Sequence, residues 1–297
     1  MTTREKLLQD YWNYLQMRNY SIDTRRSYLG GIKRFWNFCE SRRGDKNFDK
    51  NNAVQTYLAY RTGVQHRDFS TVNGDYSALK WFYIGVLGRT WDLNKLKRPK
   101  AEKRLPRYIS PGQFSSLVQA GETAQTKLLF LLYYSTGMRS NEGRLLKWED
   151  IAFDEGFIHV RKGKGAKDRM VVLHPELEEL LKEHRKGQRE GHLYVFSADG
   201  GANPFPKGTL YSLFVNARRK ANLPDWVSAH VLRHSYATTA LRNGTDILSL
   251  QELLGHVQLR TTARYVHLNV NHLKRSYNPL SDQCLHATIQ NREQPLP

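Results

Sequence analysis

Apolar residues recur at helical spacing through the first hundred residues of the chain. The spacing predicts four helices, over Arg4–Met17, Thr24–Glu40, Asn52–Tyr60 and Thr71–Val86. In the second of these, the aromatic and aliphatic side chains fall on one face, while Arg25, Lys33 and Arg34 occupy others. An aromatic stripe of this kind is more often core than a base-stacking platform, so this half is predicted to be a compact helical module with basic surfaces.

Further along, the pattern changes between helical and strand periodicity. The apolar run 126–136 predicts a buried helix that Gly137 ends, and a short second helix begins at about Ser140. In "GFIHVRKGKGAKDRMVVL", residues 156–173, apolar residues alternate on both sides of a Gly-Lys-Gly turn, which predicts a β-hairpin.

The remaining pattern is mostly helical. Helices are predicted from Pro175 to about Lys186, over Gly208–Ala221 and over "HVLRHSYATTALRNG", which Gly244 stops, with "LYVF" at 193–196 as a short strand. The predicted fold class is mainly α, with one small antiparallel β-sheet in the second half and a helical bundle in the first.

A basic, proline-rich stretch separates the two halves. Residues 96–114 carry Pro99, Pro106 and Pro111 among six lysines and arginines, so they cannot be helical throughout. We interpret the stretch as a linker, although a solvated surface loop inside one domain is the alternative. The predicted domains are 1–97 and 111–297, joined by the linker 98–110.

The charge of the chain points to a polyanionic partner. Its 46 Lys and Arg against 28 Asp and Glu give a net charge of +18. The first 100 residues hold 19 basic and 9 acidic side chains, a net +10, which leaves +8 for the rest. Two basic halves favour a protein that holds a nucleic-acid backbone from two sides.

The sequence also limits the compartment. Cys39 and Cys284 lie far apart, which argues against a disulfide framework or a cysteine-rich zinc site. No apolar run approaches the length of a membrane span, and the first residues are too charged for a signal peptide. The reducing cytoplasm is the expected location.

Six side chains at helix ends, a hairpin tip and helix starts could converge on one phosphate. They are Arg139, Lys164, His230, Arg233, His256 and Tyr265. Each alone is more often a surface, capping or core residue. Together, two arginines can bind the non-bridging oxygens of a phosphodiester, and a phenol beside a proton acceptor and positive charge can attack its phosphorus. A lysine on the hairpin could protonate the 5′ oxygen that leaves.

At these residues the sequence resembles the tyrosine recombinase (phage integrase) family. The matching boxes are T-G-M-R with Glu142 three residues on, G-K-G-A-K-D-R, H-V-L-R-H, and L-G-H followed by R-Y-V-H, in order between roughly Leu128 and Leu268. The N-terminal half is similar only loosely, to the helical SAM-like core-binding module of such proteins. The resemblance implies a simple two-domain enzyme of the Xer or integrase type, without the extra arm-binding domain of many phage integrases.

The resemblance also implies a role for each matching residue. Arg139 and Arg233 would bind the scissile phosphate, and Tyr265 would form a 3′-phosphotyrosine. Lys164 would be the general acid, His230 would assist the proton transfer of the tyrosine, and His256 would support the transition state, with Glu142 as an acidic residue behind them. The covalent bond stores the energy of the broken strand, so neither ATP, another cofactor nor a metal is expected.

Some assignments have rivals. Lys162 and Lys167 flank Lys164, and the register of the hairpin decides which of them reaches the phosphate. His234 and His267 are rival histidines, which we assign to packing or phosphate positioning, because His234 lies on a different face from Arg233. In "LLGHVQLRTTARYVHL", we expect Gly255 to end a helix and Thr261 or Thr262 to cap the next, which would present Tyr265.

The segment after the tyrosine suggests a partner. Leu273, Tyr277 and Leu280 form an apolar stripe that could close the core of its own subunit. In the family such a segment docks on the neighbouring subunit, which implies a homotetramer on two synapsed double-stranded DNA sites. The free protein could be a monomer.

Three function classes remain open from the sequence. The first is a site-specific recombinase that works through a Holliday junction, in DNA integration, excision or dimer resolution. The second is a type IB topoisomerase-like enzyme, which relaxes DNA by the same chemistry without exchanging partners. The third is a DNA-binding protein without activity. The filled catalytic positions and the candidate exchange segment favour the recombinase.

Overall fold

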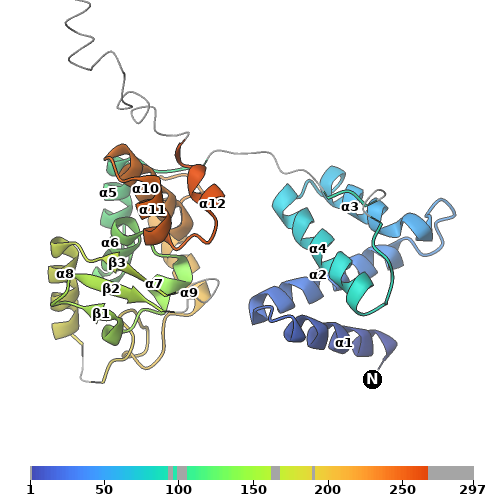
Figure 1. The fold of residues 1–297 in the computed structure, drawn as a ribbon, viewed down its shortest axis with the longest axis horizontal. Helices are drawn as coiled ribbons and strands as arrows, with labels where there is room; N and C mark the ends of the chain where they lie inside the picture. Colours follow the sequence, from blue (N-terminus) through green and yellow to red (C-terminus); the bar gives the residue numbers. More distant parts are fainter. Residues whose placement is uncertain (1, 93–95, 99–105, 162–167, 189–190, 267–297) are drawn as a thin grey trace, which may run out of the picture. The chain divides into compact units, whose positions relative to one another are not determined.

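The structure, a computed structural model, describes residues 2–92, 96–98, 106–161, 168–188 and 191–266. The chain divides into two compact units, Met1–Arg104 and Leu105–Pro297 (Figure 1). The fold class predicted from the sequence is confirmed, since the first unit is helical and the second combines helices with one three-stranded antiparallel sheet.

The first unit consists of four helices at the positions that the sequence predicts. They are α1 (Thr3–Met17), α2 (Ile22–Ser41), α3 (Ala53–Gly63) and α4 (Phe69–Gly85), with a 3₁₀ turn at Lys50–Asn52 before α3. Local capping starts three of them. Thr2 and Glu5 cap α1 reciprocally, the Ser21 hydroxyl caps α2, and the Asp68 carboxylate caps α4.

The predicted apolar faces of these helices meet in a core that contains a buried ion cluster. Tyr11, Ile32 and Leu79 are fully buried, which confirms that the aromatic stripe of α2 faces a core. At its centre, Asp75 of α4 is 1% exposed and accepts hydrogen bonds from Arg34, Arg61 and Tyr57. The four groups satisfy one another, so the charge of Asp75 is tolerated away from water.

The second unit contains eight helices within the described residues. They are α5 (Pro111–Gln119), α6 (Ala124–Thr136), α7 (Ser140–Arg144), α8 (Pro175–Lys186), α9 (Lys207–Lys220), α10 (Ala229–Arg242), α11 (Ile247–Leu254) and α12 (Leu259–Ala263). The sequence located α6 to α10 to within a few residues. It did not identify α5, which begins inside the predicted basic stretch, where Ser110 and Gln113 cap each other and Pro111 fits the first turn.

The small sheet has the order β1-β2-β3 and is antiparallel throughout. Its strands are β1 (Ile151–Ala152), β2 (Phe157–Val160) and β3 (Arg169–Val172), with Ile158 paired with Val171. The predicted hairpin is therefore present. The predicted strand at 193–196 is wrong: only Tyr194 forms a bridge, to Lys147. The next residues do not extend it, because Val195 donates to Leu146 while the carbonyl of Phe196 accepts from Phe205, in a different segment.

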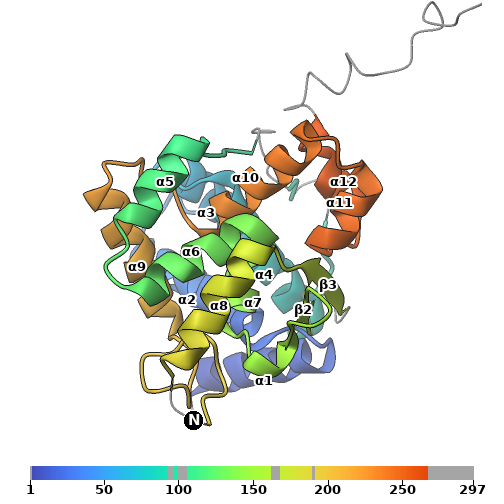
Figure 2. The ribbon, with the colours of Figure 1, turned by 90° about the vertical axis from the view of Figure 1, so that its left-hand side faces the viewer.

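Two apolar clusters hold the second unit together. The larger one joins α5, α6, α8, α9 and the sheet, with Phe130, Leu132 and Phe196 fully buried. Helix α10 packs along α6, as Figure 2 shows, and its other side contacts α11. There Ala237, Leu241, Leu250 and Leu254 form the smaller cluster together with Tyr265.

Candidate active site

A left-handed turn at the end of α6 directs Arg139 away from the helix. Gly137 takes φ of +62°, and a Cβ there would lie 2.4 Å from a ring carbon of Tyr236, so only glycine fits this turn. Arg139 then occupies the N-cap of α7, with its side chain 23% exposed. The sequence predicted both the helix end and the departure of this arginine.

Glu142 connects Arg139 to a second arginine of the hairpin. Its carboxylate accepts from the backbone N–H and the guanidinium of Arg139, both at 2.7 Å. Both terminal nitrogens of Arg169 also donate to it, at 3.0 and 2.7 Å. Burial by itself would raise the pKa of Glu142, but the hydrogen bonds and charges of Arg169 and Arg139 outweigh it and lower this pKa to about 2.

Arg233 lies on α10 and is 2% exposed, the largest of the fully buried side chains. It donates to the carbonyl of Gly137 at 2.7 Å and to that of Leu254, and its Nη2 lies 3.1 Å from Nε2 of His256. Burial and the charge of Arg139 lower its pKa to about 10, which leaves the guanidinium charged at neutral pH.

His256 follows Gly255, which ends α11 in the left-handed conformation as predicted. The Nδ1 of His256 lies 2.8 Å from the hydroxyl of Thr262, so the ring is fixed at both nitrogens. The expectation that Thr261 or Thr262 caps the next helix is wrong. Helix α12 begins earlier, after Gln258, and the buried Thr262 hydroxyl serves His256 instead.

Three arginines converge on the C-terminal end of α11. Arg169, Arg233 and Arg139 donate to the carbonyls of three consecutive residues, Leu253, Leu254 and Gly255. The last carbonyls of a helix lack partners within the helix and carry its negative dipole end, so cations are stabilising there. The geometry brings the predicted pair Arg139 and Arg233 together around the loop that carries His256.

Tyr265 is 3% exposed, and among the predicted site residues that the structure describes only Arg233 is more buried. It lies in a turn that follows α12, not in the helix itself, which corrects the expectation that the helix presents it. Its ring packs in the smaller apolar cluster, and its hydroxyl lies 2.6 Å from Nδ1 of His234. Burial raises the pKa of this phenol, while Arg233 and Arg264 act in the opposite direction.

The histidine in contact with the tyrosine is thus His234. From the sequence this residue was expected to serve packing or phosphate positioning, and among the hydrogen bonds of the described residues none joins His230 to Tyr265. The sequence did contain a signal for this contact. His230 and His234 are four residues apart on one helix, and residues at that spacing share a face. The ring of His230 contacts that of His234, with centroids 4.4 Å apart.

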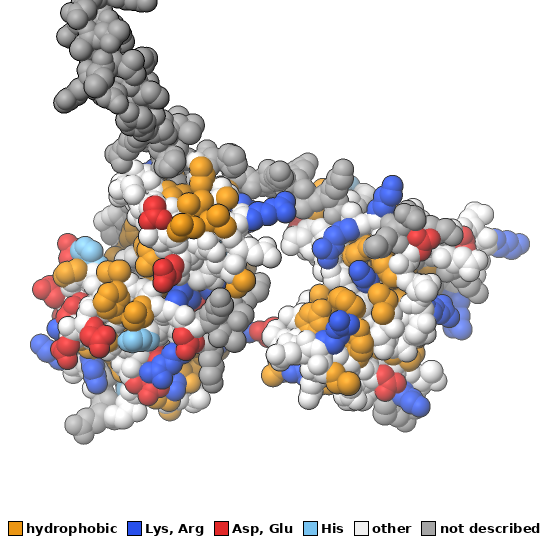
Figure 3. Space-filling model, viewed as in Figure 1, with side chains coloured by type: hydrophobic (Ala, Val, Ile, Leu, Met, Phe, Trp, Pro, Cys, Tyr) orange, Lys and Arg blue, Asp and Glu red, His pale blue; other side chains and the backbone are white. Residues whose placement is uncertain are grey.

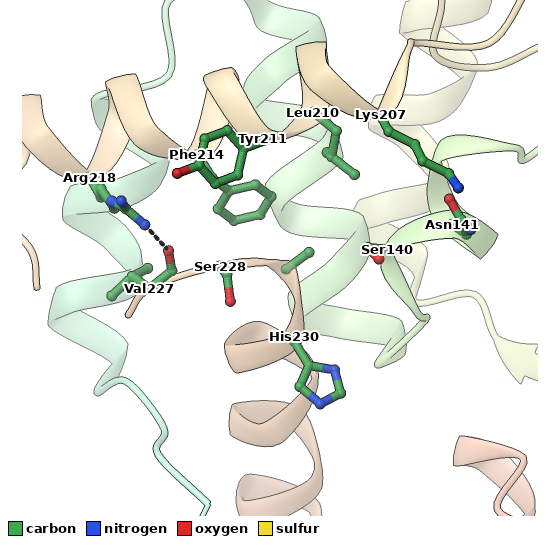
Figure 4. Close-up of a pocket in the computed structure, with 11 residues that line it drawn as sticks. Ser140, Asn141, Lys207, Leu210, Tyr211, Phe214, Arg218, Val227, Ser228 and His230 are labelled. Carbon is green, nitrogen blue, oxygen red and sulfur yellow. Dashed lines mark hydrogen bonds between the residues drawn. The ribbon is translucent and has the colours of Figure 1, made fainter. Parts of the chain in front are cut away.

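His230 also forms the edge of a pocket of about 380 Å³ between α7, α9 and α10. Figure 4 shows Tyr211 and Phe214 on one side of this pocket, Lys207 and Asn141 at one end, and Arg218 bound to the carbonyl of Val227 at the other. The pocket opens beside the first turn of α10, so His230 borders a surface with basic and aromatic side chains.

Some predicted residues lie outside the described part of the chain. These are Lys162, Lys164, Lys167, His267 and the segment with Leu273, Tyr277 and Leu280. Within the described ranges, no three His, Cys, Asp or Glu side chains gather as a metal site. No helix in the same ranges is long and apolar enough to cross a membrane.

Comparison with known proteins identifies the family. The profile of the phage integrase family matches residues 107–272, and that of the phage integrase N-terminal SAM-like domain matches residues 7–93. The chain belongs to the phage integrase family. The predicted resemblance is confirmed, and with it the predicted class of enzyme, a tyrosine-type site-specific recombinase.

Individual relatives are similar over almost the whole chain. Tyrosine recombinase XerA of Pyrococcus furiosus is 30% identical over 281 residues, which cover 93% of this chain and 94% of the relative. The crystal structure of XerH site-specific recombinase bound to palindromic difH substrate, a post-cleavage complex, is 26% identical. It matches with a TM-score of 0.68, covering 91% of this chain and 83% of that one. A lambda integrase dimer bound to a core site, 19% identical with a TM-score of 0.69, shares the fold, covering 94% of this chain and 99% of its own.

Proposed function

We propose that this recombinase cuts and rejoins DNA at specific sites through a 3′-phosphotyrosine at Tyr265. The observation that carries the proposal is the convergence of Arg139, Arg233 and His256 on one loop, with Tyr265 in the turn that follows it. Arg139 comes from a part of the chain more than a hundred residues before His256 and Tyr265, and a solely structural role would not need two arginines and a histidine there.

The arginines would bind the scissile phosphate. Guanidinium groups present planar, permanently charged donors, and their bonds strengthen as charge builds on the pentavalent phosphorus. Glu142 would hold Arg139 in position, because its carboxylate fixes both the backbone and the side chain of that residue. The ring of His256, fixed between Arg233 and Thr262, would support the same transition state.

Proton transfer would involve two further predicted residues. His230 would assist the removal of the phenolic proton, and its ring lies against that of His234, which contacts the hydroxyl. Lys164, on the segment between β2 and β3, would protonate the leaving 5′ oxygen. Because the phosphotyrosine retains the energy of the broken strand, a new 5′ hydroxyl can displace the tyrosine without ATP, another cofactor or a metal.

The complete reaction would join two duplexes. We propose a homotetramer on two synapsed double-stranded DNA sites, strand exchange through a Holliday junction, and a cytoplasmic location. The related XerH recombinase is bound to its difH substrate in the crystal, which supports a specific DNA site as the partner here. Figure 3 shows Lys and Arg side chains on both units, and a basic linker over 98–110 would let both contact the backbone.

A suicide substrate tests the chemistry. The DNA site is first selected from a random duplex library with the purified chain, and then nicked so that cleavage releases a short strand. The wild type is expected to trap a covalent adduct, and Tyr265→Phe none. Tyr134→Phe, whose ring stacks on Phe114 elsewhere in the same unit, is the matched control and should react normally. An adduct with Tyr265→Phe would overturn the assignment.

The predicted tail contact needs its own test. We propose that the segment with Leu273, Tyr277 and Leu280 docks on the neighbouring subunit. A chain that ends before Asn271 should still form the covalent adduct but lose synapsis and strand exchange. Intact exchange by this shortened chain would show that the segment does not couple subunits.

A further inference from the structure

The hydroxyl of Tyr265 is bonded to a histidine that stands outside the predicted catalytic set. The phenolic oxygen lies 2.6 Å from Nδ1 of His234, a short and direct contact. Among the described residues, His234 is the one hydrogen-bond partner of this hydroxyl. The following inference rests on the proposed function, since it concerns how Tyr265 becomes a nucleophile.

The direction of this hydrogen bond follows from burial. Tyr265 is 3% exposed, so an O–H that pointed away from His234 would be buried without an acceptor from the described part of the chain, which is costly. The phenol therefore donates, and Nδ1 of His234 accepts with the ring proton on Nε2. This arrangement requires a neutral imidazole.

The surroundings keep His234 neutral. Burial comes first, followed by the charged or titratable groups that face the ring: His230 and Arg233 from α10, Arg264 after α12, and His256 from the loop between α11 and α12. Together they lower the pKa of His234 to about 3, so a lone pair on Nδ1 is available throughout the neutral range.

We propose that His234 is the immediate proton acceptor of Tyr265. As the phenolic oxygen forms its bond to phosphorus, the proton moves to Nδ1, and the P–O5′ bond breaks with its electron pair on the 5′ oxygen. That oxygen takes its proton from the general acid on the hairpin. When a 5′ hydroxyl later attacks the phosphotyrosine, its proton passes to the general acid that cleavage left deprotonated, and the proton on Nδ1 returns to the departing phenol.

The bound phosphodiester favours this transfer. The cationic neighbours disfavour an imidazolium in the protein alone, and the negative phosphate counteracts them when DNA is present. His230 keeps its predicted assisting role. Its ring contacts that of His234, and its charge acts on the imidazole that takes the phenolic proton. The direct contact with the reacting oxygen belongs to His234.

The experiment measures single-turnover cleavage of the suicide duplex by the full chain, with oxygen or sulfur as the 5′ bridging atom. His234→Leu keeps the bulk and removes the acceptor, and it is expected to cleave at least about 100-fold more slowly than the wild type. His234→Asn can accept a hydrogen bond through its amide oxygen but cannot take a proton, so its rate should lie between the two. DNA affinity, from titration of the intact site, should stay within about twofold of the wild type.

The sulfur substrate distinguishes protonation of the leaving 5′ atom from deprotonation of Tyr265. A thiolate leaves without a proton, so Lys164→Ala should recover on it, whereas His234→Leu should remain slow. His174→Leu, at the exposed N-cap position of α8, where the side chain makes no capping hydrogen bond, is the matched control and should match the wild type. Wild-type or faster cleavage by His234→Leu would overturn the inference, as would rescue of this variant by sulfur. An adduct that persists in Tyr265→Phe would instead overturn the proposed function.

Discussion

Glu142 and Arg169 form a bidentate ion pair, in which each carboxylate oxygen accepts a hydrogen bond from one terminal nitrogen of the guanidinium. Their side chains are 9% and 5% exposed, so the pair lies almost completely away from water. Glu142 also holds Arg139, and Arg169 also holds the carbonyl of Leu253. The pair therefore joins the hairpin, the α6–α7 turn and the end of α11.

Removal of the Glu142 carboxylate should lower the free energy of unfolding. Glu142→Ala leaves Arg169 buried without its partner, and loss of one member of a buried pair costs about 3–5 kcal/mol. Urea unfolding followed by circular dichroism measures the loss. Glu142→Gln keeps the shape and should lose less stability than the alanine variant. Equal stability of Glu142→Ala and wild type would show that the pair contributes nothing net.

Stability should fall as the solution becomes acidic, because of the half-buried His256. Burial, Arg233, Arg139, Arg169 and His230 hold the pKa of His256 at about 4, against 6.5 for an ordinary histidine. Above pH 6.5 both folded and unfolded chains keep the ring neutral. Below it the unfolded chain binds the proton first, so stability is lost progressively from pH 6.5 down towards 4.

A melting series between pH 7.5 and 5.0 checks this dependence. His256→Gln removes the titrating ring and should flatten the decline of the melting temperature with falling pH. A His256→Gln series parallel to the wild type would assign the acid sensitivity to other groups. Glu142 cannot cause a decline in this range, because its lowered pKa of about 2 costs stability only as the pH falls below its ordinary value of 4.5.

Replacement of Gly255 by alanine should disturb the site without touching a catalytic side chain. Gly255 has φ of +60°, and a Cβ would lie 2.8 Å from Cδ of Arg169. Strain of this kind costs about 1–3 kcal/mol. We expect a lower melting temperature and slower covalent adduct formation. Gly112→Ala, where a Cβ meets no atom within 4 Å, is the matched control.

The buried carboxylate of the first unit should matter for stability alone. Asp75→Ala leaves Arg61, whose side chain is 7% exposed, without its anion, and should destabilise the chain by about 3–5 kcal/mol. Urea unfolding followed by tryptophan fluorescence is suitable, since four of the six tryptophans belong to this unit. A change confined to DNA affinity, with unfolding unaltered, would contradict the structural role.

DNA binding should weaken steeply with salt. Each neutralised phosphate contributes about −0.9 to the slope of log K against log salt concentration, because binding releases condensed counterions. Fluorescence anisotropy of the selected duplex between 50 and 300 mM salt gives this slope. Binding that is insensitive to salt would contradict a basic protein of net charge +18 holding the backbone from two sides.

The helices and the order of the motifs could be predicted because they depend on local signals. Periodicity located α1 to α4, and Gly137 and Gly255 marked helix ends that need positive φ. The strand at 193–196 was wrong since an apolar run of four fits a strand or a buried loop equally well. Whether the run forms a strand or a buried loop depends on the segments with which it pairs, and these segments are distant in the sequence.

The candidate site likewise contains residues that local motifs reveal and residues whose roles depend on contacts across the fold. Arg139, Arg233, His256 and Tyr265 stand at motif positions, and the structure brings them together. Arg169 and His234 were missed because their roles depend on contacts across the fold: with Glu142, 27 residues away, and with Tyr265, 31 residues away. Sequence spacing can state which residues share a helix face, but not what lies opposite that face.

The carbonyls at the end of α11 occupy the arginines that we propose bind the scissile phosphate. Arg139 and Arg233 donate to Gly255 and Leu254, so in this proposal an incoming phosphate would compete with the backbone that leads towards the tyrosine turn. Under the proposed function, phosphate binding and the position of Tyr265 would therefore depend on the same arginine donors. A substitution that alters either arginine would then also shift the tyrosine turn, so changes of DNA specificity are expected at other surface positions.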